Sequence, residues 1–285
     1  MKPAFSTVAC PHWTLDQIAE RAEPWGYQGI ELRTFGSGST QFAGDPALTA
    51  PSKTRLLFDR AGIDLACLAT SIRFDAPLGP PLLGHVLPST DTSIAETKDA
   101  ISLAAKLECP FIRVFGFEIM GSESKARAIQ RIASRLALAA DACRNRGVRL
   151  LIENGGSFAT ATDLAEIIDQ VNHPLVSAAY SVAAAHGAGE HPSSGINVLS
   201  DRLELVRLKD YRGGKPVALG SGEIPNKEAV RALAARGFEG WLVYEHPAAW
   251  ITVAGGDVVA LLAEGSRAMY SWLDAPAKRP APASV

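Results

Sequence analysis

The sequence predicts an α/β fold, a closed (β/α)8 barrel (TIM barrel), from three observations. Short apolar runs alternate with longer amphipathic segments, as strands and helices do around a parallel sheet. Eight such units follow one another along the chain. The chain has 285 residues, and one barrel of this class typically needs about 250. A single domain over residues 1–285 is therefore the simplest organisation.

The eight strands are assigned to apolar runs of strand length, which are rich in β-branched and aromatic residues. The predicted strands are Phe5–Ala9, Gly29–Leu32, Ile63–Leu68, Phe111–Phe115, Val148–Ile152, Val176–Tyr180, Leu203–Leu208 and Trp241–Tyr244. The predicted helices are Leu15–Ala22, Lys53–Arg60, Thr92–Leu107, Ser124–Arg146, Thr162–Val171, a short one near Ser194–Leu199, Asn226–Ala235 and Val258–Trp272. In the fourth helix, Arg131, Arg135 and Arg144 are expected outside the apolar stripe.

An open, doubly wound sheet would show the same alternation of strands and helices. That fold often carries a GxGxxG turn after its first strand. Here the glycine-rich GSGST segment, Gly36–Thr40, follows the second strand and lacks that spacing. The count of eight units therefore favours the closed barrel.

Composition and charge exclude several classes of partner. The formal net charge is −2 and the pI is about 6.3, whereas nucleic-acid binding rewards clustered Lys and Arg. The four cysteines, Cys10, Cys67, Cys109 and Cys143, lie far apart in apolar segments, which predicts buried free thiols. No apolar run is long enough for a signal peptide or a membrane span. A cytoplasmic protein without a nucleic-acid or membrane partner is expected.

Two segments are expected to be irregular. The loop Arg73–Asp91 carries four prolines and would form a stiff roof over the pocket of a barrel. The tail, residues 275–285, has too few apolar side chains to pack and is expected to be flexible.

Five sequence segments, in order, carry a resemblance to a known family. They are GYQGIELR (Gly26–Arg33), RLLIENGG (Arg149–Gly156), LVRLKDY (Leu205–Tyr211), LGSGEIP (Leu219–Pro225) and GWLVYEHP (Gly240–Pro247). Together they resemble the sugar isomerase/epimerase family of xylose isomerase-like TIM barrels, over roughly residues 3 to 273. The resemblance implies a pocket at the C-terminal ends of the strands and a small carbohydrate substrate. It also implies a homodimer, for which Trp250 is a candidate interface residue.

The resemblance further implies a divalent metal held by a Glu after strand five, an Asp after strand six, a His on strand seven and a Glu after strand eight. The two glutamates match Glu153 and Glu245. Ser181 stands at the aspartate position and Arg207 at the histidine position. We therefore expect no metal cofactor. The alternative is a divalent cation (Mn, Mg, Co or Zn) at Glu153 and Glu245, completed by a histidine such as His186 or His246.

Two carboxylates at one barrel mouth raise each other's pKa unless a cation lies between them. Arg207 can supply that charge, because a guanidinium donates several hydrogen bonds to carboxylates. The leading hypothesis is that Glu153 and Glu245 are the base and acid of an isomerase or epimerase, acting on a carbon next to a carbonyl. In this hypothesis Arg207 stabilises the enediolate.

Further substrate contacts are expected from polar residues near the strand ends. These candidates are Lys209, His186, Ser181, Glu31, Arg113, His12 and Trp13. For several of them a structural role is an open alternative. Glu31 and Arg33 could form an internal salt bridge, Arg113 could belong to an ion pair inside the barrel, and Trp13 could simply pack.

Other functions are compatible with the same barrel. A keto-sugar dehydratase or lyase also begins with proton abstraction next to a carbonyl. A catalytically inactive sugar-binding protein would explain the departure from the metal-binding pattern. An AP endonuclease is disfavoured by the net negative charge and the scattered histidines.

Overall fold

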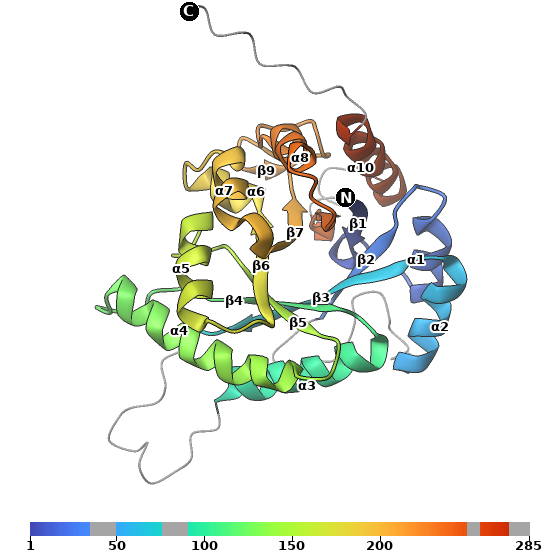
Figure 1. The fold of residues 1–285 in the computed structure, drawn as a ribbon. Coiled ribbons are helices and arrows are strands. Elements are labelled where there is room, and N and C mark those ends of the chain that lie inside the picture. The colour runs from blue at the N-terminus through green and yellow to red at the C-terminus, as the bar shows by residue number, and fades with distance from the viewer. Residues whose placement is uncertain (35–49, 76–90, 250–256, 274–285) are drawn as a thin grey trace, which may run out of the picture.

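The eight predicted strands close into a parallel barrel in the order β1-β10-β7-β6-β5-β4-β3-β2, as Figure 1 shows. The computed structural model describes residues 1–34, 50–75, 91–249 and 257–273. The barrel strands are β1 (Lys2–Ser6), β2 (Gly29–Arg33), β3 (Asp64–Arg73), β4 (Phe111–Phe115), β5 (Arg149–Glu153), β6 (Val176–Ser181), β7 (Leu203–Leu208) and β10 (Trp241–Tyr244). The prediction of a closed (β/α)8 barrel is confirmed.

The helices form an outer ring around this barrel (Figure 1). They are α1 (Leu15–Ala22), α2 (Pro51–Ala61), α3 (Thr92–Leu107), α4 (Lys125–Ala140), α5 (Ala161–Val171), α6 (Val182–Gly187), α7 (Pro192–Leu199), α8 (Asn226–Ala235) and α10 (Val258–Leu273). Short 3-10 turns follow β1, α4 and α7 at Thr7–Ala9, Asp141–Cys143 and Ser200–Arg202. A small antiparallel ribbon, β8 (Tyr211–Arg212) with β9 (Lys215–Pro216), follows β7.

Local sequence signals explain where the helices begin and end. Thr14 and Thr160 each form a capping box with the residue three positions on, so the first backbone N–H groups of α1 and α5 find partners. At the other end of α2, Gly62 adopts the left-handed conformation with φ 66°, which glycine adopts without a steric cost.

Several boundaries and one side chain differ from the prediction; for example, β3 extends to Arg73 and does not end at Leu68. The first strand is Lys2–Ser6 and not Phe5–Ala9, because residues 7–9 already turn in a 3-10 helix at the barrel mouth. The helix α4 ends at Ala140, before the predicted Arg146. Arg135 is buried, against expectation. It donates to the Asp91 carboxylate at 2.7 Å and to the Phe74 carbonyl at 2.7 Å, which compensates its burial.

Strand alternation divides the barrel interior into layers, because every second side chain points into the lumen. The lower layer is apolar and contains Ala4, Ala66, Cys67, Leu151, Ala179, Leu205, Trp241 and Val243. Two positions further along six strands the lumen residue is polar: Ser6, Arg113, Glu153, Ser181, Arg207 and Glu245. The apolar layer therefore closes the lumen beneath a polar layer at the C-terminal ends of the strands.

Several other expectations can be compared with the described residues. All four cysteines are buried and unpaired, as predicted. Among the described helices, none has the length and apolar character that crossing a bilayer requires. The expected roof from residue 76 to 90, Trp250 and the tail lie outside the described residues.

The bottom of the barrel gives a stability prediction at Gly29. A Cβ at this position would lie 2.4 Å from the Trp241 ring, so Gly29→Ala forces the ring or the strand to move. Overpacking of this kind typically costs about 1–3 kcal/mol, which denaturant unfolding would measure. The control is Gly187→Ala, where a Cβ meets no atom within 4 Å. Equal stability of the two variants would contradict the close packing of Gly29 on Trp241.

Candidate active site

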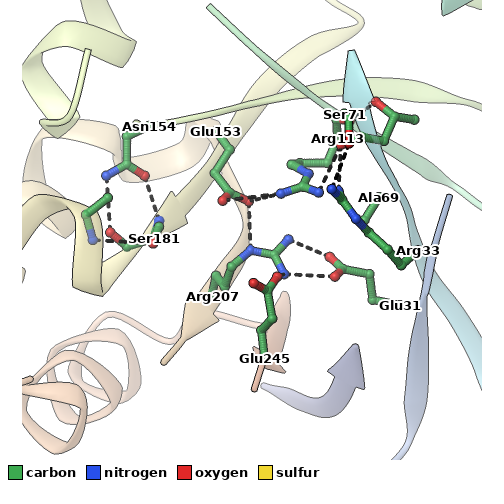
Figure 2. A network of polar contacts seen from close by, with 12 residues as sticks. Glu31, Arg33, Ala69, Ser71, Arg113, Glu153, Asn154, Ser181, Arg207 and Glu245 are labelled. Atoms are coloured by element: carbon green, nitrogen blue, oxygen red, sulfur yellow. Dashed lines mark hydrogen bonds and ion pairs between the residues drawn. The ribbon is translucent and has the colours of Figure 1, made fainter. Parts of the chain in front are cut away.

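A ring of charged side chains lies in the polar layer of the barrel (Figure 2). Glu31 comes from β2, Arg113 from β4, Glu153 from the end of β5 and Arg207 from β7, and Glu245 follows β10. Each sits at a lumen-facing position near the C-terminal end of its strand, where the side chains of a barrel converge. The fold therefore brings together residues separated by up to 214 positions in the sequence, the interval between Glu31 and Glu245.

Arg207 is the centre of this ring and has no solvent exposure. Its Nη1 and Nη2 donate to the two carboxylate oxygens of Glu31 at 2.8 and 2.6 Å. Its Nε donates to Glu153 at 2.8 Å, and Nη1 also donates to Glu245 at 2.5 Å. Burial alone would lower the pKa of Arg207, but the glutamates Glu153, Glu31 and Glu245 outweigh it and raise that pKa well above its ordinary value.

The charges of this ring also shift the pKa values of its carboxylates. Burial alone would raise the pKa of Glu31, but the Arg207 guanidinium outweighs burial and lowers it. For Glu245, Lys209 and then Arg207 outweigh the pKa-raising effect of burial. The pKa of Glu245 therefore lies well below the ordinary range. Glu245 is therefore ionised at neutral pH.

Lys209 is the second cation on Glu245. Its Nζ lies 2.5 Å from Glu245 Oε1, and 23% of its side chain is exposed. The next residue, Asp210, is buried and accepts backbone N–H groups of Gly220, Gly222 and Ile224 at 2.8, 3.0 and 3.2 Å. This carboxylate thus ties the loop after β7 directly behind Lys209. A Cβ on Gly222 would lie 2.1 Å from Asp210 Oδ1, which explains the glycine in the LGSGEIP segment.

A cavity of about 290 Å³ opens above the ring. Its lining residues are Val8, Arg33, Arg113, Phe115, Phe117, Glu153, Asn154, Gly155, Ser181, Ala184, Lys209 and Glu245. The wall thus contains two carboxylates, three cationic side chains and a pair of aromatic rings, which meet edge to face at 5.6 Å. It presents hydrogen-bonding groups on one side and apolar surface on the other, as sites for small polar molecules do.

Asn154 is a cavity residue that the sequence reasoning missed. Its Oδ1 accepts the Ser181 backbone N–H at 2.6 Å, and its Nδ2 donates to the Ser181 carbonyl at 3.1 Å (Figure 2). This pair joins the ends of β5 and β6 beside Glu153. The signal was its place directly after Glu153 in the RLLIENGG segment.

Five of the predicted site residues line the cavity together: Glu153, Glu245, Arg113, Lys209 and Ser181. Arg207 and Glu31 do not. Both have no exposed surface, and they bind each other beneath the cavity. Contrary to the prediction, Arg207 therefore does not contact an enediolate, and Glu31 does not contact substrate. For Glu31 the structure shows an internal salt bridge, with Arg207 and not with Arg33.

Four other candidates lie away from the cavity wall. His186 was expected in a loop but lies exposed near the end of α6, and His12 is also exposed. Trp13 packs against Trp25, with ring centroids 6.2 Å apart, which is the packing alternative. His246 is buried beside Tyr244, on the opposite side of the strand from Glu245, as strand alternation predicts. None of these residues is part of the cavity wall described above.

The residues present do not fit the metal that the resemblance implies. The guanidinium of Arg207 occupies the position between Glu31, Glu153 and Glu245, and it donates to all three. Within the described ranges no group of three His, Cys, Asp or Glu side chains is arranged to hold a metal ion. Neither His186 nor His246 belongs to the cavity wall that Glu153 and Glu245 share.

Comparison with known proteins agrees with this architecture. The sequence matches the family described as xylose isomerase-like TIM barrel over residues 19–272. The chain therefore belongs to this family. No curated protein sequence gives a significant match.

Solved structures share the fold at low sequence identity. The IOLI protein with a binding zinc atom has a TM-score of 0.76 at 17% identity, with 96% of this chain and 98% of that chain covered. The probable 3-DHS dehydratase AsbF from Bacillus anthracis has a TM-score of 0.75 at 14% identity, covering 95% and 99%. An L-ribulose 3-epimerase has a TM-score of 0.75 at 15% identity, covering 96% and 94%. The similar structures thus include both epimerases and a dehydratase.

The burial of Arg207 gives a second stability prediction. Arg207→Met leaves Glu31 and Glu153 buried without their main counterion, and breaking a buried pair in this way typically costs about 3–5 kcal/mol. Denaturant unfolding would measure the loss. The double variant Arg207→Met/Glu31→Gln should recover part of it, because one uncompensated carboxylate is removed. No recovery would contradict the pairing.

The same variants should differ in their response to pH. In the native protein the pKa of Glu31 is lowered, so its stabilising contribution is present above about 4.5 and is lost as the pH falls through the lowered value. Without Arg207, burial raises that pKa, so ionised Glu31 destabilises the fold at neutral pH. The deficit of Arg207→Met should therefore shrink between about pH 8 and pH 5, and unfolding curves across that range would show it. A deficit independent of pH would contradict this account.

The metal prediction concerns the purified protein. Because Arg207 takes the carboxylates that a divalent ion would need, we expect no stoichiometric Mn, Mg, Co or Zn after purification without chelator. Elemental analysis measures this directly. An equimolar ion that is lost in Glu153→Gln would contradict the expectation.

Proposed function

We propose that this protein is an isomerase or epimerase of a carbohydrate bearing a carbonyl group, and that it works by carboxylate acid/base catalysis. The observation that carries the proposal is the placement of Glu153 and Glu245 in one cavity wall, both bonded to a single buried guanidinium. Membership of the xylose isomerase-like family supports the same class of reaction.

Arg207 acts as a positioning residue in this proposal. It fixes one oxygen of Glu153 and one of Glu245 through neighbouring nitrogens of the same group, which is rigid and planar. The other oxygen of Glu245 binds Lys209. Both carboxylates are thereby held in orientation at the cavity, which is a requirement for efficient proton transfer.

The protonation states divide the roles. Because the pKa of Glu245 is lowered, it starts as a carboxylate and is able to accept a proton, not to donate one. Lys209 lines the cavity and carries a positive charge next to Glu245. We assign to Lys209 the role first expected of Arg207, namely stabilising negative charge on the enediolate oxygen.

The reaction then follows from these positions. Glu245 removes the proton from the carbon next to the carbonyl, and the electron pair of that C–H bond moves to the carbonyl oxygen to form the enediolate. If Glu245 returns this proton to the adjacent carbon while the hydroxyl proton moves to the former carbonyl oxygen, the product is an isomer. If solvent supplies a proton through Glu153 to the opposite face of the same carbon, and Glu245 releases its own proton to solvent, the product is an epimer. Glu153 and Glu245 are the two carboxylates available in the cavity for these transfers.

The test is solvent-deuterium exchange into a panel of ketoses and related carbonyl sugars. Wild type should exchange the proton next to the carbonyl of its substrate, and Glu153→Gln or Glu245→Gln should slow exchange by about 10² to 10⁴-fold. Glu239→Gln is the matched control, because Glu239 is exposed and precedes β10 at the opposite end of the barrel. This control should exchange at the wild-type rate.

Product mass adds a second readout. An unchanged mass indicates isomerisation or epimerisation, whereas loss of water indicates a dehydratase. Wild type without exchange on any member, or both glutamine variants at the wild-type rate, would overturn the acid/base roles. Binding of a sugar without turnover would instead indicate a sugar-binding protein.

A further inference from the structure

Two arginines in the cavity wall are incompletely paired: Arg33 has no carboxylate partner among the described residues, and Arg113 forms one long salt bridge, to Glu153 at 3.4 Å. Arg33 donates to the Thr70 carbonyl at 2.8 Å and to Ser71 Oγ at 2.8 Å. Arg113 donates to the same Thr70 carbonyl at 3.0 Å. Two guanidinium groups thus share one neutral acceptor, and each repels the other.

The carboxylates Glu245 and Glu31 offset this repulsion at Arg33 only in part, because burial and Arg113 outweigh them. Arg113 reaches Glu153 only at 3.4 and 3.5 Å, and its Nε is buried without an acceptor. Glu153 makes its shorter contact, 2.8 Å, with Arg207. Arg33 forms no ion pair with any carboxylate of the described residues.

The charge of Arg33 persists in spite of this setting. Burial first, and then the neighbouring Arg113, lower the pKa of Arg33 to about 10. The group therefore remains a cation at neutral pH. An anion placed beside Arg33 and Arg113 would satisfy unused donors and separate two like charges at once.

The number of charges indicates the charge of that anion. The ring and cavity wall contain four cationic side chains, Arg33, Arg113, Arg207 and Lys209, and three glutamates, Glu31, Glu153 and Glu245. These seven side chains leave one positive charge; the carboxylate of Asp210, behind Lys209, lies outside the cavity lining and is bound by three backbone N–H groups. A singly charged group neutralises it, whereas a doubly charged phosphate would leave an excess negative charge in a confined site.

We propose that the substrate is a sugar acid, and that Arg33 and Arg113 bind its carboxylate while Glu153, Glu245 and Lys209 face its carbonyl end. The inference rests on the proposed function for the reaction itself, but the anion site depends only on the two arginines. Arg113 lies between the two parts, since it contacts both the Thr70 carbonyl shared with Arg33 and the Glu153 carboxylate. A substrate with its carboxylate at one end and its carbonyl at the other spans this wall.

The experiment compares matched ligands that differ at one carbon. Hexuloses carry a hydroxymethyl group at C6, the corresponding hexuluronates carry a carboxylate there, and the 6-phosphates carry a dianionic ester. Titration calorimetry at low ionic strength gives Kd for each, using a panel of ring stereoisomers. The best hexuluronate should bind at least about tenfold more tightly than its hexulose, since hydrogen bonds to charged groups contribute about 1.5–3 kcal/mol.

Variants connect that preference to the site. Arg33→Gln should weaken hexuluronate binding by about 10- to 100-fold and hexulose binding much less, so that the preference for the acid is lost, and Arg33→Lys should restore part of the preference. Arg60→Gln is the matched control, because Arg60 is an exposed arginine at the end of α2, and it should bind as wild type does. Circular dichroism and unfolding curves verify that each variant is folded.

The outcomes separate this inference from the proposed function. Binding of a hexuluronate that depends on Arg33 supports the anion site, even if no deuterium exchange follows and the acid/base proposal fails. Equal binding of hexulose and hexuluronate, a preference kept in Arg33→Gln, or no binding of any acid would overturn the anion site. Tighter binding of the 6-phosphate would overturn the assignment of the anion as a carboxylate. Exchange into a neutral hexulose would then leave the proposed function intact.

Discussion

A single buried guanidinium determines how the candidate site is arranged. Arg207 has no exposed surface and bonds to three glutamates from different parts of the barrel wall. Removing it would leave like charges confined together in a low-dielectric interior, where each would resist ionisation. The geometry and charge of Glu153 and Glu245 therefore both depend on a residue that does not itself reach the cavity. Because Arg207 is part of β7, chelators and the availability of metal ions do not affect its positive charge.

Much of the fold followed from periodicity, because each barrel strand is a short apolar run between longer segments. Phe111–Phe115 and Leu203–Leu208 were predicted with their observed bounds. Alternation continued past β10 also correctly predicted that His246 would point away from Glu245. Errors arose where tertiary contacts decide the outcome. The burial of Arg135 depends on an aspartate 44 residues away, which the pattern of α4 alone does not reveal.

The same limit applies to the site. A family resemblance and the strand positions placed Arg207, Glu153 and Glu245 together, but they did not show how deeply each side chain is buried in the barrel. Alternation indicates that a side chain faces the lumen, yet whether it meets solvent depends on partners such as Glu31, which lies 176 residues from Arg207. The sequence also did not reveal that Arg33 and Arg113 share the Thr70 carbonyl as an acceptor, because this depends on the relative register of β2, β3 and β4.

The hydrogen bonds around Asp210 determine how ordered the rim of the cavity is. One carboxylate accepts three backbone N–H groups of the segment after β7, and the Asn226 side chain donates to the Lys209 carbonyl at 2.9 Å. This part of the rim is therefore already ordered before a ligand binds. Since little conformational entropy remains to be lost there, Lys209 should meet its ligand without a folding step on this side.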